Sequence, residues 1–138
     1  MIQRIQSVYL LGACILLEVS ASVLYLLPDN VFNGYRLVFA IALAVLGIAG
    51  LGAVFLFKRR ELQVRLVRIL GAVNILIVVA LLTASYLTGD LTKIAVGGPF
   101  AVITGVFLAP VIASILFFQA GGAIQRDIDL IRSMDRIR

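Results

Sequence analysis

The sequence predicts an all-α membrane protein with four transmembrane helices, because it combines four long apolar segments, an extreme composition and a one-sided distribution of cations. Hydrophobic residues make up 62% of its 138 residues, and the mean hydropathy is +1.13. A soluble fold of this size has no core that can hold so many apolar side chains. A soluble helical bundle also needs a polar face on every helix, and residues 43–57 and 75–82 offer none.

Each apolar segment is long enough to cross a bilayer, which takes about 20 residues in a helix. Only Glu18 interrupts the first segment, and the other three carry no charge. A signal peptide would stay apolar at that point, so we expect the first helix to be a permanent span. Turn-forming residues separate the segments, for example Pro28-Asp29-Asn30 and Gly97-Gly98-Pro99. We therefore expect a transmembrane domain over 1–122, with spans near 7–27, 37–57, 69–88 and 99–120.

The cations predict the orientation of these spans. If the N-terminus is cytoplasmic, that side of the membrane holds ten cations, and the opposite side holds only Arg36 and Lys93. Cytoplasmic loops carry an excess of Lys and Arg, so both termini should be cytoplasmic. No basic patch is interleaved with aromatic residues, which argues against a nucleic-acid partner. The ten cations are instead expected to contact anionic headgroups or a protein partner: Arg4, Lys58, Arg59, Arg60, Arg65, Arg68, Arg126, Arg132, Arg136 and Arg138.

Small residues indicate where helix backbones approach one another. In the fourth span Ala101, Gly105, Ala109 and Ala113 recur every four residues and form one smooth stripe. Such stripes allow close packing between membrane helices. We favour packing within a single four-helix bundle, and a dimer interface is the alternative.

Glu18 is the one ionisable residue deep inside a predicted span. A charge exposed to lipid there costs about 2.5–3.5 kcal/mol on insertion scales, so its carboxyl group should be protonated, face the bundle or pair with donors. Pro110 lies at a similar depth in the fourth span and leaves the carbonyl group of Val106 without its usual donor. We expect an intramembrane polar centre that a protonated Glu18 shares with the third or fourth helix. Its candidate members are Glu18, Cys14, Ser22, Pro110 and Ser114.

Two interpretations of Glu18 remain open. It is either a structural anchor between helices or the carboxyl group of a proton pathway. The layout resembles that of small multidrug exporters, which also have four short spans and a glutamate in the first. The chain lacks Trp, however, and its strong charge bias fixes one orientation, whereas those exporters have a weak bias. Asn74 in the third span is expected to form a separate interhelical amide hydrogen bond.

The sequence contains few of the residues and motifs that enzymes use for catalysis. There is no His, which removes the usual general base and imidazole metal ligand. The single Cys excludes an intramolecular disulfide, and no glycine-rich loop resembles a phosphate-binding motif. We expect no enzymatic activity, metal or cofactor, although a bound lipid is compatible with the sequence.

Two predicted cytoplasmic segments offer more for binding. Residues 58–68 either lie along the headgroups or extend the neighbouring helices. The tail over 123–138 has the pattern of an amphipathic helix, with apolar residues at steps of three or four: Ile124, Ile128, Ile131, Met134 and Ile137. This tail is either an interfacial anchor or a docking helix for a partner.

The two ends of the chain also resemble a known family. The opening MIQRIQSVYLL over 1–11, and the closing AIQRD and SMDRIR within 123–138, are similar to the ends of an uncharacterised family of bacterial four-span inner-membrane proteins, domain of unknown function 4293. This resemblance implies a bacterial inner membrane and no assigned activity. We expect an accessory or scaffold subunit that binds other membrane-protein subunits. The alternative is a small proton-coupled transporter that uses Glu18, as an oligomer.

Overall fold

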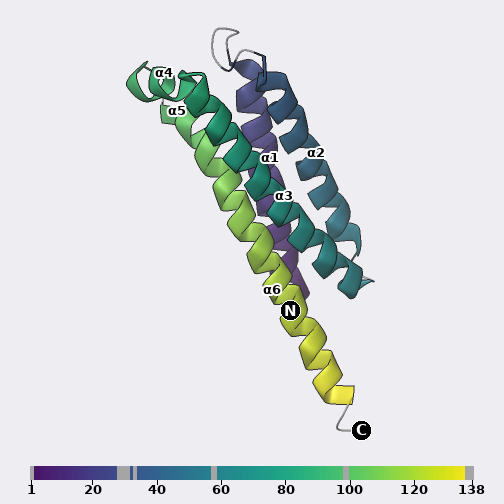
Figure 1. The fold of residues 1–138 in the computed structure, drawn as a ribbon. Coiled ribbons are helices and arrows are strands. Elements are labelled where there is room, and N and C mark those ends of the chain that lie inside the picture. The colour runs from purple at the N-terminus through teal and green to yellow at the C-terminus, as the bar shows by residue number, and fades with distance from the viewer. Residues whose placement is uncertain (1, 28–31, 33, 57–58, 98–99, 136–138) are drawn as a thin grey trace.

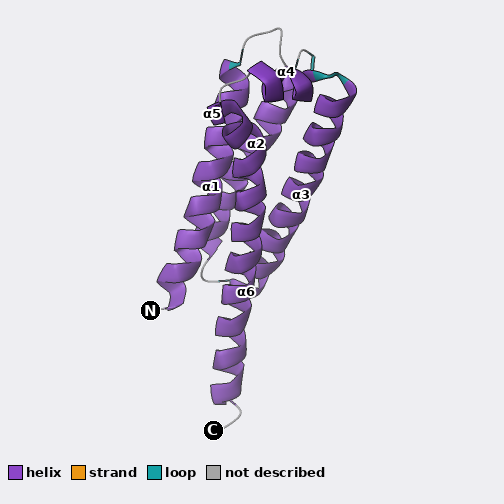
Figure 2. Ribbon diagram, turned by 90° about the vertical axis from the view of Figure 1, so that its left-hand side faces the viewer, coloured by secondary structure: helices purple, strands orange, loops and turns teal. Residues whose placement is uncertain are grey.

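The computed structural model describes residues 2–27, 32, 34–56, 59–97 and 100–135, and within these ranges the side chains of all but 2–4, 94–97, 100–101 and 135. The described residues form helices joined by short connections, with no strand among them (Figures 1 and 2). The elements are α1 (Ile2–Leu26), α2 (Arg36–Phe55), α3 (Arg60–Leu87), α4 (Asp90–Gly97), α5 (Phe100–Ile103), the π-helical turn η2 (Thr104–Leu108) and α6 (Ala109–Asp135).

Four of these helical stretches are long and apolar enough to cross a membrane, which confirms the predicted all-α fold with four spans. They cover Ile5–Leu26, Arg36–Phe55, Arg60–Leu87 and Thr104–Met134. Successive long helices run in opposite directions, so the start of α1 and the end of α6 lie at the same end of the molecule (Figure 2). We call this the terminal end of the bundle. The end of α1, the start of α2 and α4 lie at the opposite end (Figures 1 and 2).

The helices extend further at the terminal end than the spans predicted from hydropathy. Helix α3 begins at Arg60, so residues 60–68 of the basic segment extend the third span and do not lie apart from it. Helix α6 continues from Ala109 to Asp135 without a break, so the predicted tail is helical over its described residues, 123–135, but is not a separate element. The last turns of α6 project beyond the other helices (Figure 1).

The opposite end contains two elements that the sequence did not indicate. Gly89, with φ +73°, ends α3, and the short helix α4 begins at Asp90, whose acidic side chain suits a helix N-terminus. The π-helical turn η2 lies just before Pro110, and there the Ala109 N–H donates to the carbonyl oxygen of Thr104. This wider turn adapts the helix to a proline that has no N–H to donate.

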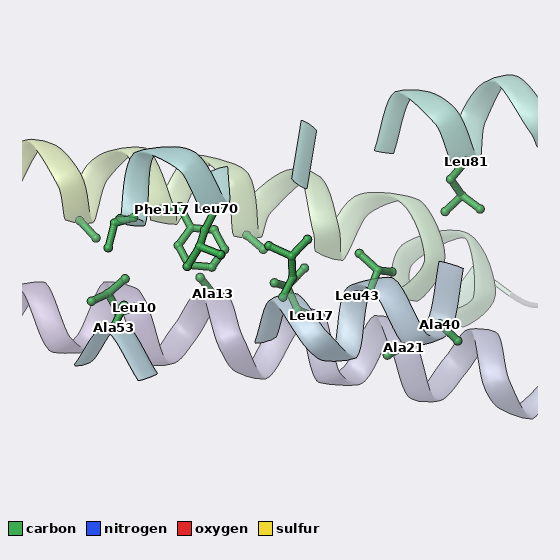
Figure 3. Packing of buried hydrophobic residues seen from close by; sticks show 14 of the residues in the cluster. Leu10, Ala13, Leu17, Ala21, Ala40, Leu43, Ala53, Leu70, Leu81 and Phe117 are labelled. Carbon is green, nitrogen blue, oxygen red and sulfur yellow. The ribbon is translucent and has the colours of Figure 1, made fainter. Parts of the chain in front are cut away.

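Helix α1 packs against α2 and α6, and α6 also packs against α3, whereas the contact between α2 and α3 is less extensive. Fully buried leucines from three helices meet in the core, together with Phe117 of α6 (Figure 3). Glycines allow the closest approaches. A Cβ atom added to Gly105 would lie 2.9 Å from Cγ2 of Val23, so the side chain of Val23 in α1 packs directly on the backbone of the fourth span.

Candidate functional site

The predicted small-residue stripe lies on the inner face of the bundle. Gly105 packs against Val23, and Ala109 and Ala113 are buried with exposed fractions of 6% and 0%. The side chain of Ala101 lies outside the described part of the chain. The three described members therefore pack against the protein's own helices, as expected for a stripe that packs within one bundle.

The structure divides the predicted polar centre into two separate sites, and the first is Glu18 with Cys14. Both side chains face glycines of α2: a Cβ atom on Gly47 would lie 2.4 Å from Oε1 of Glu18, and one on Gly50 would lie 2.7 Å from Sγ of Cys14. Glu18 therefore packs on α2 and not on the third or fourth helix. Its Oε1 is buried and has no hydrogen-bond partner among the described residues. Ser22 donates to the backbone carbonyl oxygen of Glu18, at 2.7 Å, and not to its carboxyl group.

Asn74 organises the second site, where α3 meets α6. Its Nδ2 donates to the carbonyl oxygen of Pro110 at 2.8 Å and to Oγ of Ser114 at 2.9 Å. Asn74 is fully buried, and this is the interhelical amide hydrogen bond that the sequence predicted. Pro110 and Ser114 thus belong with Asn74. Counting residues along the spans predicts that Pro110 and Ser114 lie at the depth of Glu18. Depth alone, however, carries no information on the direction in which each side chain points.

Glu18 lies beside shallow grooves between α1 and α2. One groove of about 440 Å³ runs along the halves of these helices that are further from the terminal end, from Glu18 past Ser22 to Tyr25. A second, of about 380 Å³, lies between Glu18 and Leu51. Apolar side chains line most of both grooves. These grooves offer no continuous polar path from one end of the bundle to the other.

A polar cluster joins the connections at the opposite end of the bundle. Asp90 is 3% exposed, and its carboxylate accepts hydrogen bonds from Thr88 at 2.7 Å, from Tyr35 at 2.9 Å and from Lys93 at 2.9 Å. Burial alone would raise the pKa of Asp90, but the bonds from Lys93, Thr88 and Tyr35 outweigh it and hold the pKa below its ordinary value. Burial raises the pKa of Tyr35, which keeps its hydroxyl group protonated as a donor. The cluster ties the start of α2 to the end of α3.

The sequence pattern does not indicate this cluster. Tyr35 is 53 residues from Thr88 and 55 from Asp90, so no local spacing connects them. The feature of the sequence that could have indicated the cluster is Asp90, an acidic residue immediately after Gly89, at a position where a helix can begin.

Ion pairs fasten the projecting part of α6 to the start of α3 at the terminal end. Arg60 pairs with Asp127, and Arg132 pairs with Glu61 at 2.8 Å. In addition, the amide of Gln6 in α1 donates to the carbonyl oxygen of Ala123 in α6, at 3.2 Å. These contacts hold the direction of the last turns of α6 relative to the bundle.

The apolar face of the predicted tail is divided between the core and the surface. Ile124 and Ile128 are buried, with exposed fractions of 0% and 8%, and they pack against the bundle. Beyond them Leu130, Ile131 and Met134 are exposed, at 51%, 39% and 63%. We call these three residues the tail surface. No described residue covers it, and the last predicted member of the face, Ile137, lies outside the described residues.

Most of the described cations at the terminal end are exposed and have no acidic partner among the described residues. Arg60 and Arg132 form the two ion pairs, whereas four others form none with a described residue: Arg59, Arg65, Arg68 and Arg126. Of the remaining predicted contact residues, Lys58, Arg136 and Arg138 lie outside the described residues, as does the side chain of Arg4. Within the described part of the chain, no three His, Cys, Asp or Glu side chains are grouped as metal ligands.

These features define a multi-pass membrane protein, built as a four-helix bundle whose last helix extends past its terminal end. The chain belongs to the family described as Domain of unknown function (DUF4293), whose sequence profile matches residues 23–137. The match contains all but the last residue of the closing segment that suggested this family, and it leaves the opening residues 1–11 outside. No curated protein and no solved structure matches the chain significantly.

Proposed function

We propose that the protein is a non-enzymatic accessory subunit of a larger complex in the inner membrane of a bacterium, and that it docks its partner through the tail surface. The observation that carries the proposal is the exposure of Leu130, Ile131 and Met134 on a helix that the bundle holds in a fixed direction. The lack of His and of a second Cys supports a role without catalysis. The excess of cations at the terminal end supports a cytoplasmic location for this surface.

The direction of α6 favours docking over anchoring in the lipid interface. An interfacial amphipathic helix lies in the plane of the membrane. Helix α6 instead continues the axis of its span without interruption (Figure 2). Arg126 is the first charged residue after the apolar run, and Met134 follows eight residues later, about 12 Å further along the axis. The headgroup layer is only about 5–8 Å thick on each side, so Met134 reaches the aqueous side.

The charges around the tail surface define the chemistry of the partner. Arg59 and Arg126 lie at the same end of the bundle and have no acidic partner among the described residues. A complementary partner presents an apolar helix face flanked by carboxylates at its cytoplasmic end. We assign this description to another integral membrane subunit whose helix also extends beyond the headgroups, because the tail surface lies just outside the membrane.

A charge placed in the tail surface should release the partner. We expect Met134→Asp to lower the amount of partner that co-purifies in mild detergent at least tenfold, because a carboxylate would be buried without a donor. Ser133→Asp is the matched control, since it adds the same charge one residue away, about 100° around the helix axis. The measurement is the molar ratio of partner to protein in both preparations, by quantitative mass spectrometry.

The same partner must also form a photo-crosslink with a probe placed at Ile131. Equal ratios for Met134→Asp and Ser133→Asp, at equal accumulation of the two variants, would contradict the docking proposal. So would a wild-type preparation in which no protein is present in a fixed ratio.

Proton-coupled transport is the second candidate, and the observation that favours it is the buried Oε1 of Glu18 without a partner among the described residues. Such a group in a membrane span is a usual component of a proton pathway.

In the accessory proposal Glu18 has only a packing role. We then expect liposomes with wild type and with Glu18→Gln to show the same proton leak under an imposed membrane potential, measured with an enclosed pH-sensitive dye. A wild-type flux that falls at least tenfold in Glu18→Gln, at unchanged thermal stability, would favour transport instead.

A further inference from the structure

A groove of about 730 Å³ lies between the first turns of α1 and residues 115–130 of α6, towards the terminal end of the bundle. This volume is within the range of sites that hold small ligands. Ile5 and Tyr9 of α1 form one wall, and Ile115 and Phe118 of α6 form the other. Gln119 lies beside Phe118, the charged residues Arg126 and Asp127 follow two turns further along α6, and Leu130 lines the groove beyond them. The groove is therefore mainly apolar near Ile115 and charged near Arg126.

The length and direction of the groove match one leaflet of a bilayer. From Ile115 to Arg126 is eleven residues of helix, or about 16 Å. Half of a hydrocarbon core is about 15 Å thick. Because Arg126 is the first charge after the apolar run, the charged end of the groove lies at the headgroup level and its apolar end near the bilayer centre. A phospholipid has the same order of groups over the same length.

The charged residues that line the groove determine which phospholipid headgroup it can bind. Asp127 is paired with Arg60 of α3, whereas Arg126 is exposed and has no acidic partner among the described residues. The available charge is therefore positive. A phosphate group with a net negative charge would find a guanidinium donor there.

Gly122 keeps the middle of the groove open. A Cβ atom added to this residue would meet no atom within 4 Å. On the inner side, the hydrogen bond from Gln6 to the carbonyl oxygen of Ala123 holds α1 and α6 together at this level. A larger side chain at Gly122 would enter the groove without a clash in the protein itself.

We propose that this groove binds one anionic phospholipid of the surrounding membrane, with an acyl chain between α1 and α6 and the phosphate group at Arg126. The groove shares Leu130 with the tail surface, and Arg126 lies beside both, so the lipid test uses the purified chain, in which no partner competes, and Gly122, which lies in the groove alone. A membrane lipid is the occupant, since the groove provides a long apolar chain site as well as a charge.

Native mass spectrometry of the full chain tests the proposal with phosphatidylglycerol and phosphatidylcholine of identical acyl chains. Wild type should retain one phosphatidylglycerol and bind it about fivefold more tightly than phosphatidylcholine, as expected for one interfacial cation. Arg126→Gln should lose this preference and keep binding to phosphatidylcholine. Gly122→Leu should lose retention of both lipids. Arg65→Gln is the control, because it removes an exposed cation outside the groove lining.

Equal affinities of wild type for the two lipids would overturn the proposal, as would unchanged lipid retention in Gly122→Leu. Displacement of the bound lipid by glycerol phosphate at similar concentration would show a site for free phosphate and would also overturn it. Circular dichroism and thermal unfolding of each variant show whether loss of binding comes from loss of the fold.

Discussion

Gly50→Leu is expected to destabilise the bundle by about 3 kcal/mol or more, because no space exists for a side chain at this position. A Cβ atom on Gly50 would lie 2.7 Å from Sγ of Cys14 in α1 and 3.2 Å from Cζ of Phe117 in α6. The substitution would therefore force α2 away from two helices at once. The seam between α1 and α2 would open at the level where Cys14 and Glu18 pack.

Gly52→Leu is a closely matched control for this prediction. It lies two residues away in α2, and a Cβ atom there would meet nothing within 4 Å. Both substitutions replace glycine by leucine inside a helix, so the gain in helix propensity is the same, about 1 kcal/mol. The measurement is reversible unfolding in mixed micelles, followed by circular dichroism. Equal stability of the two variants would contradict the close approach of α2 to α1 and α6.

Phe117→Ala is expected to lower the free energy of unfolding by about 3–5 kcal/mol, the range for removal of a buried Phe side chain. Phe117 is fully buried and joins three helices (Figure 3). Its ring lies 3.2 Å from the position of a Cβ on Gly50 in α2, and its Cβ lies 3.3 Å from the same position on Gly71 in α3. Removal of the ring would leave a cavity at the junction of α2, α3 and α6.

The neighbouring Phe118 provides the comparison, since it has the same side chain on the same helix but is 46% exposed. A side chain that faces lipid loses little when it is shortened, because lipid is as apolar as the protein surface. We expect Phe118→Ala to change the stability by about 0.5 kcal/mol. If both alanine variants unfold at the same denaturant activity, Phe117 is not the centre of the core.

Length and hydropathy were sufficient to predict the four spans, because a bilayer accepts only helices that satisfy their own backbone hydrogen bonds. The helix starts and ends at the terminal end could not be predicted in the same way. Whether 60–68 continues α3 depends on tertiary contacts, such as the hydrogen bond from Gln63 to the carbonyl oxygen of Ala53 and the ion pair of Arg60 with Asp127. A hydropathy pattern contains neither of them.

The contacts of Glu18 show a second limit of sequence analysis. Counting residues from the membrane surface gives the depth of a side chain but not its rotation about the helix axis. Asn74 therefore takes Pro110 and Ser114 as partners, and Glu18 packs on Gly47.

The central claim is that α6 leaves the membrane along its own axis and carries the tail surface into the aqueous phase. A spin label on Ser133→Cys, in a Cys14→Ser background in liposomes, tests this claim most directly through its collisions with a water-soluble nickel reagent and with oxygen. Ile112→Cys, in the middle of the span, provides the reference for a buried depth. We predict that the label at 133 collides mainly with the nickel reagent and that the label at 112 collides mainly with oxygen. A label at 133 with the collision pattern of the headgroup layer or the lipid interior would contradict the claim.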